Sequence, residues 1–346
     1  MSVPGAFRSQ ARACDRLGSP FMVRLLTGLA ESWDETSALG RRFAAWEGDI
    51  GPAGASLPLR LAGGLHALHL SGAAPALSAV YPPADPAPAA LARAVGEALA
   101  AHETFLLDWV ERAPQTNEIR RSAVLIAAAH WLADRHGLPL CLSELGASGG
   151  LNLGFDRFAL ELGDRRHGPD RPVLTLAPGW EGPQPPRAHV RVAERRGVDV
   201  APLDPARPED ALRLLAYLWP DQPERIARTR AAIAAHDAVV DAGDAAAWLE
   251  ARLAAPRPGR LHLVYHTIAW QYFPEATQTR ARAALEAAGA RAGEDAPLAW
   301  LSMEADGRPD GAALRLRLWP GDRRLALGRA DFHGRWVLWE GPERLP

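Results

Sequence analysis

Residues Leu138–Asn152 read LPLCLSELGASGGLN, and this stretch decides the fold that we expect for the chain. An apolar strand, Leu138–Leu145, leads into a glycine-rich turn, Gly146–Gly150, and then into a helix. Glycines let a backbone approach a ligand closely, and a helix start presents unpaired N–H groups. In open α/β sheets, ligands bind at the carboxyl ends of strands. The stretch therefore predicts a ligand-binding loop, with a plain strand-to-helix turn as the alternative.

Helices and short apolar strands alternate from Asn117 to the end of the chain. This alternation implies parallel strands with right-handed crossovers, and a final hairpin adds an antiparallel edge. The sequence therefore predicts an α/β fold, a three-layer sandwich with a mostly parallel sheet. Expected strands are 138–145, 188–200, 238–241, 261–266, 298–303, 313–318 and the hairpin 325–329/335–339. Expected helices are 118–136, 153–162, 208–219, 223–236, 245–254 and 275–288, with an irregular insertion at Gly163–Arg187.

Residues 1–115 have a different sequence pattern. Their apolar residues recur at helical spacing in Arg8–Leu17, Phe21–Glu31 and Ala89–Arg112. Short segments rich in glycine and proline separate these helices. We therefore expect two domains, a helical cap or lid over 1–115 and a Rossmann-like domain over 116–346.

The composition excludes several classes of function. All 39 basic residues are arginine, so Schiff-base lysines and phosphate-binding loops that need a lysine are excluded. A net charge of −2 argues against a nucleic-acid partner. No stretch resembles a signal peptide or a membrane span, which predicts a cytoplasmic protein without a membrane partner. The histidine pairs His66/His69 and His262/His266 are better explained by packing than by a metal.

Three acids follow the next two strands after the glycine-rich turn. Asp199 ends the second strand, where an acid can accept hydrogen bonds from two ribose hydroxyls. Asp241 and Asp244 follow the third strand and suit the polar edge of a base. Each acid alone is commonly a helix cap or a turn residue. Their succession after the glycine-rich turn predicts a nucleoside site.

The motifs ELGASGG, GVDVAP and VVDAGDA, in this order, resemble the first three motifs of class I S-adenosylmethionine (SAM)-dependent methyltransferases. Over nearly its whole length the chain also resembles a bacterial family of uncharacterised proteins, domain of unknown function 2332. The stretches that carry this second resemblance are TNEIRRS, ELGASGGLNL, RRGVDVAPLD, LAYLWPDQPER and VYHTIAWQYFP.

The first resemblance implies a methyltransferase-type Rossmann fold and a SAM cofactor without a metal. The implied cofactor residues are Glu144, Gly146, Ala147, Ser148, Gly149, Gly150, Asn152, Asp199, Asp241 and Asp244, with Glu194 as an alternative ribose acid. Two features depart from the methyltransferase pattern. The first loop is not Gly-x-Gly-x-Gly, and Asp199 lies 55 residues after Glu144, where roughly 20 is typical.

The fourth strand ends in His266-Thr267-Ile268-Ala269-Trp270-Gln271-Tyr272, where methyltransferases often carry Asn/Asp-Pro-Pro-aromatic. We predict His266 as a general base and Gln271 as a second catalytic residue, although a packing histidine is an equal alternative. The two asparagines of the chain flank the glycine-rich turn. We predict that Asn117, Glu118, Arg121 and Trp270 line a pocket for a small-molecule substrate.

The sequence leaves two alternatives to SAM-dependent methyl transfer. One is a non-catalytic protein of the same fold that binds a nucleoside or serves as a scaffold. The other is a serine hydrolase, because Gly146–Gly150 also fits Gly-x-Ser-x-Gly. Ser148 would then be the nucleophile, with Asp241 or Glu304 and then His333 as its partners.

Overall fold

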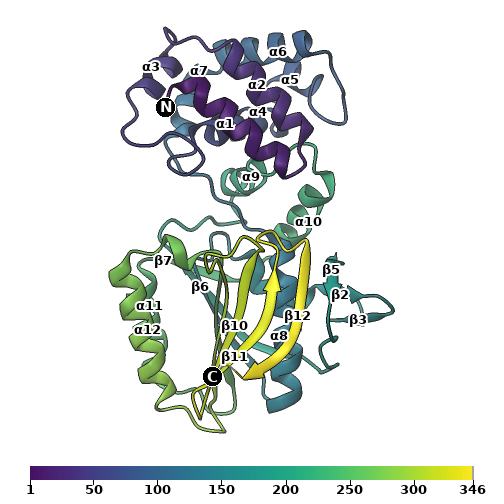
Figure 1. Ribbon diagram of the computed structural model, residues 1–346, viewed down its shortest axis with the longest axis vertical. Helices are drawn as coiled ribbons and strands as arrows, with labels where there is room; N and C mark the ends of the chain where they lie inside the picture. The colour runs from purple at the N-terminus through teal and green to yellow at the C-terminus, as the bar shows by residue number, and fades with distance from the viewer. Residues whose placement is uncertain (345–346) are drawn as a thin grey trace. The chain divides into compact units, whose positions relative to one another are not determined.

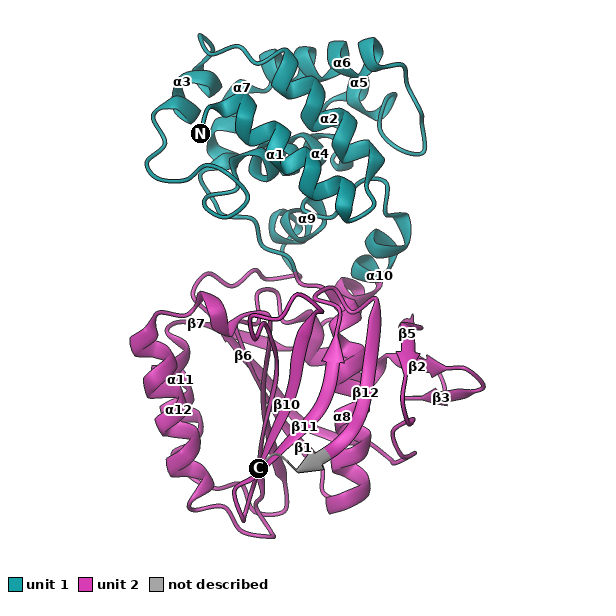
Figure 2. Ribbon diagram, viewed as in Figure 1, with its two compact units in different colours: residues 1–116, 206–230 teal, residues 117–205, 231–346 magenta. Residues whose placement is uncertain are grey.

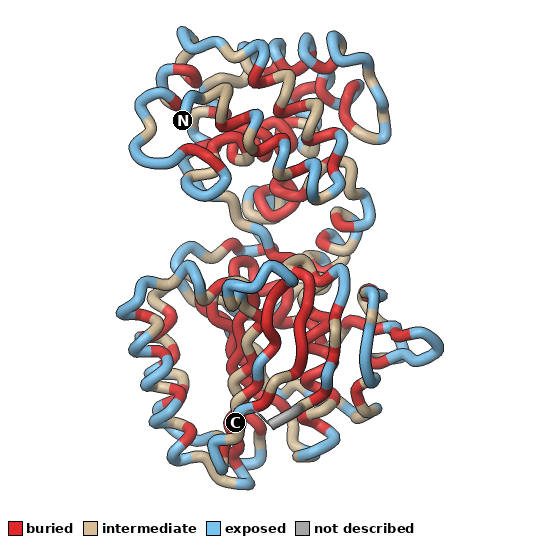
Figure 3. Tube along the Cα trace, viewed as in Figure 1, coloured by how far each residue is buried: buried red, intermediate tan, exposed pale blue. Residues whose placement is uncertain are grey.

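The computed structural model describes residues 1–344 (Figure 1). The chain divides into two compact units (Figure 2). The helical unit contains residues 1–116 together with 206–230, and the α/β unit contains 117–205 together with the chain from residue 231 onward. In both units the buried residues, red in Figure 3, form the interior.

The helical unit is built from short helices whose starts the sequence marks clearly. Its elements are α1 (Val3–Arg16), α2 (Pro20–Glu31), α3 (Ala38–Ala44), α4 (Leu57–Leu70), α5 (Pro75–Ser78), α6 (Pro88–Ala101), α7 (Glu103–Val110), α9 (Pro208–Ala216) and the first part of α10 (Pro223–Ala234). Ser2, Ser19 and Ser37 cap α1, α2 and α3 by accepting backbone N–H groups. Proline in the first turn of most of these helices removes a donor that would otherwise lack a partner.

The segment 206–230 belongs to the helical unit, whereas the sequence pattern assigned it to the second domain. Asp221 accepts hydrogen bonds from the Ser19 hydroxyl at 2.7 Å and from the Phe21 N–H at 3.0 Å. His66 of α4 contacts the carbonyl oxygen of Ala216 at 3.1 Å. These contacts join residues that are about 150 to 200 positions apart, which helical periodicity cannot report.

The α/β unit contains a nine-stranded sheet in the order β5-β12-β11-β10-β9-β8-β1-β6-β7. The strands are β1 (Leu140–Leu145), β5 (Gly179–Glu181), β6 (Val192–Asp199), β7 (Val239–Ala242), β8 (Leu261–Thr267), β9 (Leu298–Glu304), β10 (Ala312–Trp319), β11 (Arg323–Ala330) and β12 (Trp336–Arg344). From β7 to β9 all neighbouring strands are parallel, and β10, β11 and β12 continue the sheet in antiparallel pairs. The sheet is therefore mostly parallel, as predicted, with a larger antiparallel part than one hairpin.

Helices cover both faces of this sheet, which gives the three layers (Figure 1). Helices α11 (Ala245–Arg252) and α12 (Glu275–Gly289) pack side by side on one face, and α8 (Ser122–His136) lies on the other. A side chain at Gly289 would collide with Trp319, since an added Cβ would lie 2.4 Å from the indole ring. In residues 1–344 no helix is both long and apolar enough to cross a membrane.

The predicted helix at 153–162 is wrong. The structure has a 3₁₀ segment, η2 (Leu151–Arg157), followed by the strand β2 (Ala159–Leu162). Leu160 and Leu162 are buried while Glu161 is exposed, which is the two-residue period of a strand. The expected insertion then forms a small second sheet in which β2 pairs with β3 (Arg165–His167) and β4 (Thr175–Leu176).

Replacing Gly63 tests whether segment 206–230 packs on the helical unit. An added Cβ would lie 2.5 Å from the Tyr217 ring, so Gly63→Ala should lower the free energy of unfolding by about 1–3 kcal/mol. Gly96 of α6 has open space around it, and Gly96→Ala should instead stabilise the protein by about 0.4–1 kcal/mol. Urea titrations measure both effects. Equal stabilisation by both variants would contradict this packing.

Candidate functional site

The parallel part of the sheet places a switch in strand order beside β1. In chain order its strands are β1, β6, β7, β8 and β9, and in space they lie in the order β7-β6-β1-β8-β9. The chain therefore proceeds outward from β1 in one direction to β7 and then returns to the other side of β1. In doubly wound sheets, ligands bind outside the carboxyl ends of the strands at this switch point. The glycine-rich loop after β1 lies at this position.

The loop adopts a backbone that requires glycine at two positions. Gly146 and Gly150 both have φ of 68°, in the left-handed region. A Cβ on Gly146 would lie 2.7 Å from the Cβ of Ala269, and one on Gly150 would lie 2.6 Å from Val240. Ser148 also has a positive φ, 53°. The glycines thus allow the ends of β1, β7 and β8 to approach one another.

Asn117, predicted to line the substrate pocket, and Asn152, predicted to bind the cofactor, both hold this loop by hydrogen bonds. Asn117 is buried, and its side-chain oxygen accepts the N–H of Leu151 at 2.8 Å. Asn152 accepts the Ser122 hydroxyl at 2.7 Å and donates to the carbonyl oxygen of Glu118 at 3.3 Å. Both asparagines therefore connect the loop to the start of α8, and in this geometry they position its backbone.

Arg121, which the sequence placed in the same pocket, connects two other segments. Its guanidinium donates to the carbonyl oxygen of Thr267, at the end of β8, at 3.0 Å. It also donates to the carbonyl oxygen of Phe332, in the turn between β11 and β12, at 2.9 Å. Glu118 is buried, and its carboxylate accepts the backbone N–H of Arg120 at 3.1 Å.

Asp199 lies at the end of β6 and joins two loops through its carboxylate. Its Oδ2 accepts the N–H of Ser148 at 2.8 Å, and its Oδ1 accepts the N–H of Ala201 at 3.0 Å. Each carboxylate oxygen can accept about two hydrogen bonds. One acceptor position on each oxygen therefore remains beyond these two contacts. Glu194, the alternative ribose acid, is instead bound by Arg252 and Arg257.

The other two predicted acids have structural partners. Asp241 accepts hydrogen bonds from Arg196 at 2.6 Å and 2.8 Å and from the indole of Trp248 at 2.6 Å. Asp244 caps α11 by accepting the N–H of Ala247 at 2.9 Å, and it accepts the Thr277 hydroxyl at 2.7 Å. The bonds from Arg196 and from Ala247 each hold the pKa of the acid that they contact below its ordinary value.

Glu144 is the buried carboxyl group of the site. It is the penultimate residue of β1 and is only 2% exposed, and the Tyr265 hydroxyl donates to its Oε2 at 3.4 Å. Burial raises the pKa of Glu144 to about 8; the negative charge of Asp199 also raises it, whereas Tyr265 and Arg121 lower it. The site therefore holds two different carboxyl groups: Glu144 favours its neutral form, and Asp199 accepts two backbone N–H groups.

His266, the predicted general base, is engaged at both ring nitrogens. The Trp300 indole N–H donates to Nε2 at 3.0 Å. Because an indole nitrogen can only donate, Nε2 carries the lone pair and Nδ1 carries the proton. Nδ1 donates to Glu304 at 2.6 Å. In this geometry neither nitrogen is open to a substrate, and the predicted partner Gln271 is exposed.

Glu304 was not singled out from the sequence for this role, yet it organises the turn after β8. Its Oε1 accepts His266 and also the N–H groups of Ala269 at 3.0 Å and Trp270 at 3.1 Å. Ile268 in this turn has a φ of 51°, which is strained for a β-branched residue. Burial alone would raise the pKa of Glu304, but the bonds that it accepts hold it below the ordinary value. The sequence does contain a signal for Glu304: Trp300, Ser302 and Glu304 alternate with apolar residues, which places their side chains on one face of a strand.

The hydrolase alternative gains no support from these contacts. The positive φ of Ser148 suits a nucleophile turn. The two acids proposed as its partners are bound elsewhere, Asp241 by Arg196 and Glu304 by His266. Within residues 1–344, no group of three or more His, Cys, Asp or Glu side chains could hold a metal ion.

Comparison with known protein families matches residues 5–339 to a family described as an uncharacterized protein conserved in bacteria (DUF2332). The chain belongs to this family. This match confirms the family that its motifs resemble, while the resemblance to methyltransferases stays a prediction. No curated protein and no solved structure is significantly similar to the chain. The function must therefore be argued from the geometry of the site.

The raised pKa of Glu144 predicts a pH-dependent stability. Between about pH 4.5 and pH 8 the unfolded chain loses the Glu144 proton while the folded protein keeps it. The free energy of unfolding of the wild type should therefore fall as pH rises through this range. Glutamine does not titrate, so Glu144→Gln should not show this fall. The free energy of unfolding of the variant, relative to wild type, should therefore rise by about 1–3 kcal/mol from pH 5 to pH 8.

Urea titrations at the two pH values measure this change. Glu161→Gln, on the exposed face of β2, is the control for removing a surface carboxylate, and the Glu144→Gln result is read against it at each pH. A difference between Glu144→Gln and wild type that is the same at both pH values would contradict the assignment.

Proposed function

We propose that the carboxyl edge of the parallel strands binds SAM and that the protein transfers its methyl group to a small molecule. The observation that carries this proposal is the pairing of Asp199 with the glycine-rich loop, 2.8 Å from the Ser148 N–H, at the switch point of the sheet. This arrangement brings a close-approach backbone and an acid together where doubly wound sheets bind nucleosides.

The acceptor groups of the site fit the adenosyl part of SAM. Asp199 retains one acceptor position on each oxygen, and the two hydroxyls of a ribose can donate to such a pair. Asp241 and Asp244 are already bound by Arg196, Trp248, Ala247 and Thr277. We therefore assign the ribose to Asp199 and give the two later acids the role of fixing the loop after β7.

Glu144 fits the cationic part of the same molecule. A positive charge near a buried carboxyl group favours its ionised form, so a cation beside Glu144 would lower the raised pKa. The chain contains no lysine, and the proposed site needs none, because SAM carries no phosphate. The chemistry that SAM supplies is an in-line displacement, in which the methyl carbon–sulfur bond breaks as a bond to the acceptor forms.

The chain's own residues would act mainly by positioning. Asn117 and Asn152 hold the loop, and the buried surroundings of Glu144 exclude water. Acceptors that need a base to remove a proton fit less well, because Trp300 and Glu304 occupy both nitrogens of His266. This observation also favours a second function, binding of SAM without transfer. Release of S-adenosylhomocysteine in the presence of candidate acceptors would distinguish the two.

Asp199→Asn tests the site directly. By calorimetry we expect the wild type to bind SAM and S-adenosylhomocysteine saturably. We expect Asp199→Asn to bind both at least about tenfold more weakly, because hydrogen bonds to an ionised group contribute about 1.5–3 kcal/mol.

Asp156→Asn is the matched control, since Asp156 pairs with Arg195 at 2.8 Å, outside the glycine-rich loop. It should bind SAM as the wild type does, and thermal unfolding should show both variants folded. Absence of SAM binding by the wild type at about 1 mM would overturn the proposal.

A further inference from the structure

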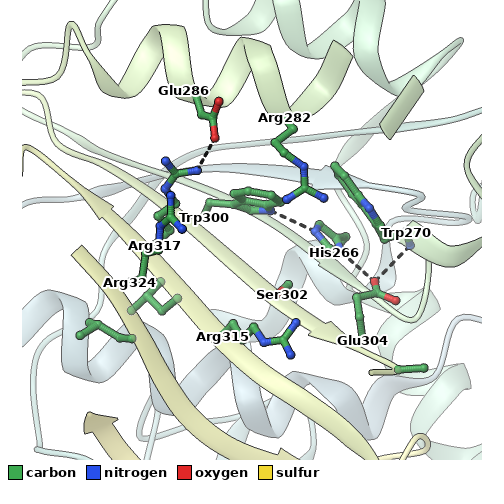
Figure 4. Close-up of a pocket in the computed structure, with 13 residues that line it drawn as sticks. His266, Trp270, Arg282, Glu286, Trp300, Ser302, Glu304, Arg315, Arg317 and Arg324 are labelled. Carbon is green, nitrogen blue, oxygen red and sulfur yellow. Dashed lines mark hydrogen bonds and ion pairs between the residues drawn. The ribbon is translucent and has the colours of Figure 1, made fainter. Parts of the chain in front are cut away.

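A groove of about 400 Å³ lies between α12 and the sheet face formed by β8 to β11 (Figure 4). Sites for small molecules commonly enclose about 300–1,000 Å³, so the groove has the size of such a site. Its walls combine two tryptophan rings, Trp270 and Trp300, with several arginine side chains. The sequence predicted that Trp270 lines the substrate pocket together with Asn117, Glu118 and Arg121, but in the structure Trp270 lines this groove and those three residues do not.

Ser302 lies in the floor of the groove, and we call the open space over its side chain the hollow. Trp300, Ser302 and Glu304 alternate along β9 and therefore project from the same face of the sheet. Ser302 is paired with His266 on β8 and with Arg315 on β10. A serine among larger side chains leaves open space in the groove, and Trp270 and Trp300, whose ring centroids lie 5.5 Å apart, together form one wall of that space.

Three arginines of the groove have unused hydrogen-bonding capacity. Within residues 1–344, Arg282 makes no ion pair, and its guanidinium lies 5.5 Å from the rings of both Trp270 and Trp300. The carboxylates that pair with Arg315 and Arg324 are each 3.9 Å away, too far for a strong hydrogen bond. These three side chains are exposed, so their donors are accessible to a ligand.

The acids of the groove do not cancel this charge. Glu286 bonds to Arg317 at 2.8 Å. Glu304 directs one oxygen to His266 and to the N–H groups of Ala269 and Trp270. The second oxygen of Glu304, Oε2, is buried and has no hydrogen-bond partner among residues 1–344, so the accessible charge of the groove comes from the guanidinium groups of Arg282, Arg315 and Arg324.

We propose that this groove binds a small planar aromatic carboxylate. The ring packs against Trp300 and Trp270 above Ser302, and the carboxylate meets the guanidinium groups of Arg315, Arg282 and Arg324. Guanidinium groups bind carboxylates through paired hydrogen bonds and stack on aromatic rings, so both parts of the ligand have partners.

This inference goes beyond the SAM proposal and does not depend on it. The turn after β8 separates the two sites, because Ala269 lies against the position of Gly146 whereas Trp270 lines the groove. Either site can therefore be present without the other.

Three probes of one shape test the proposal by calorimetry on the full chain. Naphthalene-2-carboxylate, its carboxamide and its carboxamidine differ in charge but share the same ring. We expect saturable binding of the carboxylate, at least about tenfold weaker binding of the carboxamide, and none of the cationic carboxamidine. Equal binding of all three probes, or no binding of the carboxylate, would overturn the proposal.

Variants locate the binding in the groove. Ser302→Leu fills the hollow and should abolish carboxylate binding, and Arg315→Gln should weaken it by about tenfold. Arg280 lies on the same helix as Arg282 but bonds to Glu250 of α11 at 2.7 Å, so Arg280→Gln should bind as wild type. Thermal unfolding checks that each variant is folded. Carboxylate binding that is unchanged in both Ser302→Leu and Arg315→Gln would also overturn the proposal.

Discussion

The loop after β1 depends on hydrogen bonds from side chains that are distant in the sequence. Asn117 precedes the sheet and Asp199 is the last residue of β6, and each accepts a backbone N–H of the segment Ser148–Leu151. Gly197 of β6 completes this packing, because a Cβ there would lie 2.7 Å from Ala147. A backbone tied at both ends in this way is pre-organised, so a ligand would not have to order it.

The turn after β8 is fixed by a second group of contacts, centred on Glu304. One carboxylate oxygen holds His266 and two backbone N–H groups, which stabilises the strained conformation at Ile268. The same turn presents Ala269 toward the glycine-rich loop and Trp270 toward the groove under α12. The carboxylate of Glu304 thus supports one wall of each proposed site.

Much of the α/β unit could be predicted from the sequence, because β1, β7, β8 and β9 are short and largely apolar runs that alternate with helical patterns. The strand β2 could not be predicted, since Phe155, Phe158 and Leu162 also fit the three- and four-residue spacing of a helix. The positions of Asp199 and Glu144 near the ends of strands could be predicted from the sequence. The bonds of Asp241 with Arg196, and of Glu304 with His266, join separate strands and leave no local pattern. The sequence pattern assigned 206–230 to the second domain for the same reason, because the contacts that join this segment to the helical unit link residues far apart in the chain.

A crystal structure of the protein grown with S-adenosylhomocysteine tests the central claim most directly. We expect density for the ligand outside the carboxyl ends of β1 and β6, with its ribose hydroxyls within hydrogen-bonding distance of Asp199 and its homocysteine part along Gly146–Gly150. Ligand density at another place, or an empty loop at a ligand concentration that saturates binding in solution, would contradict it.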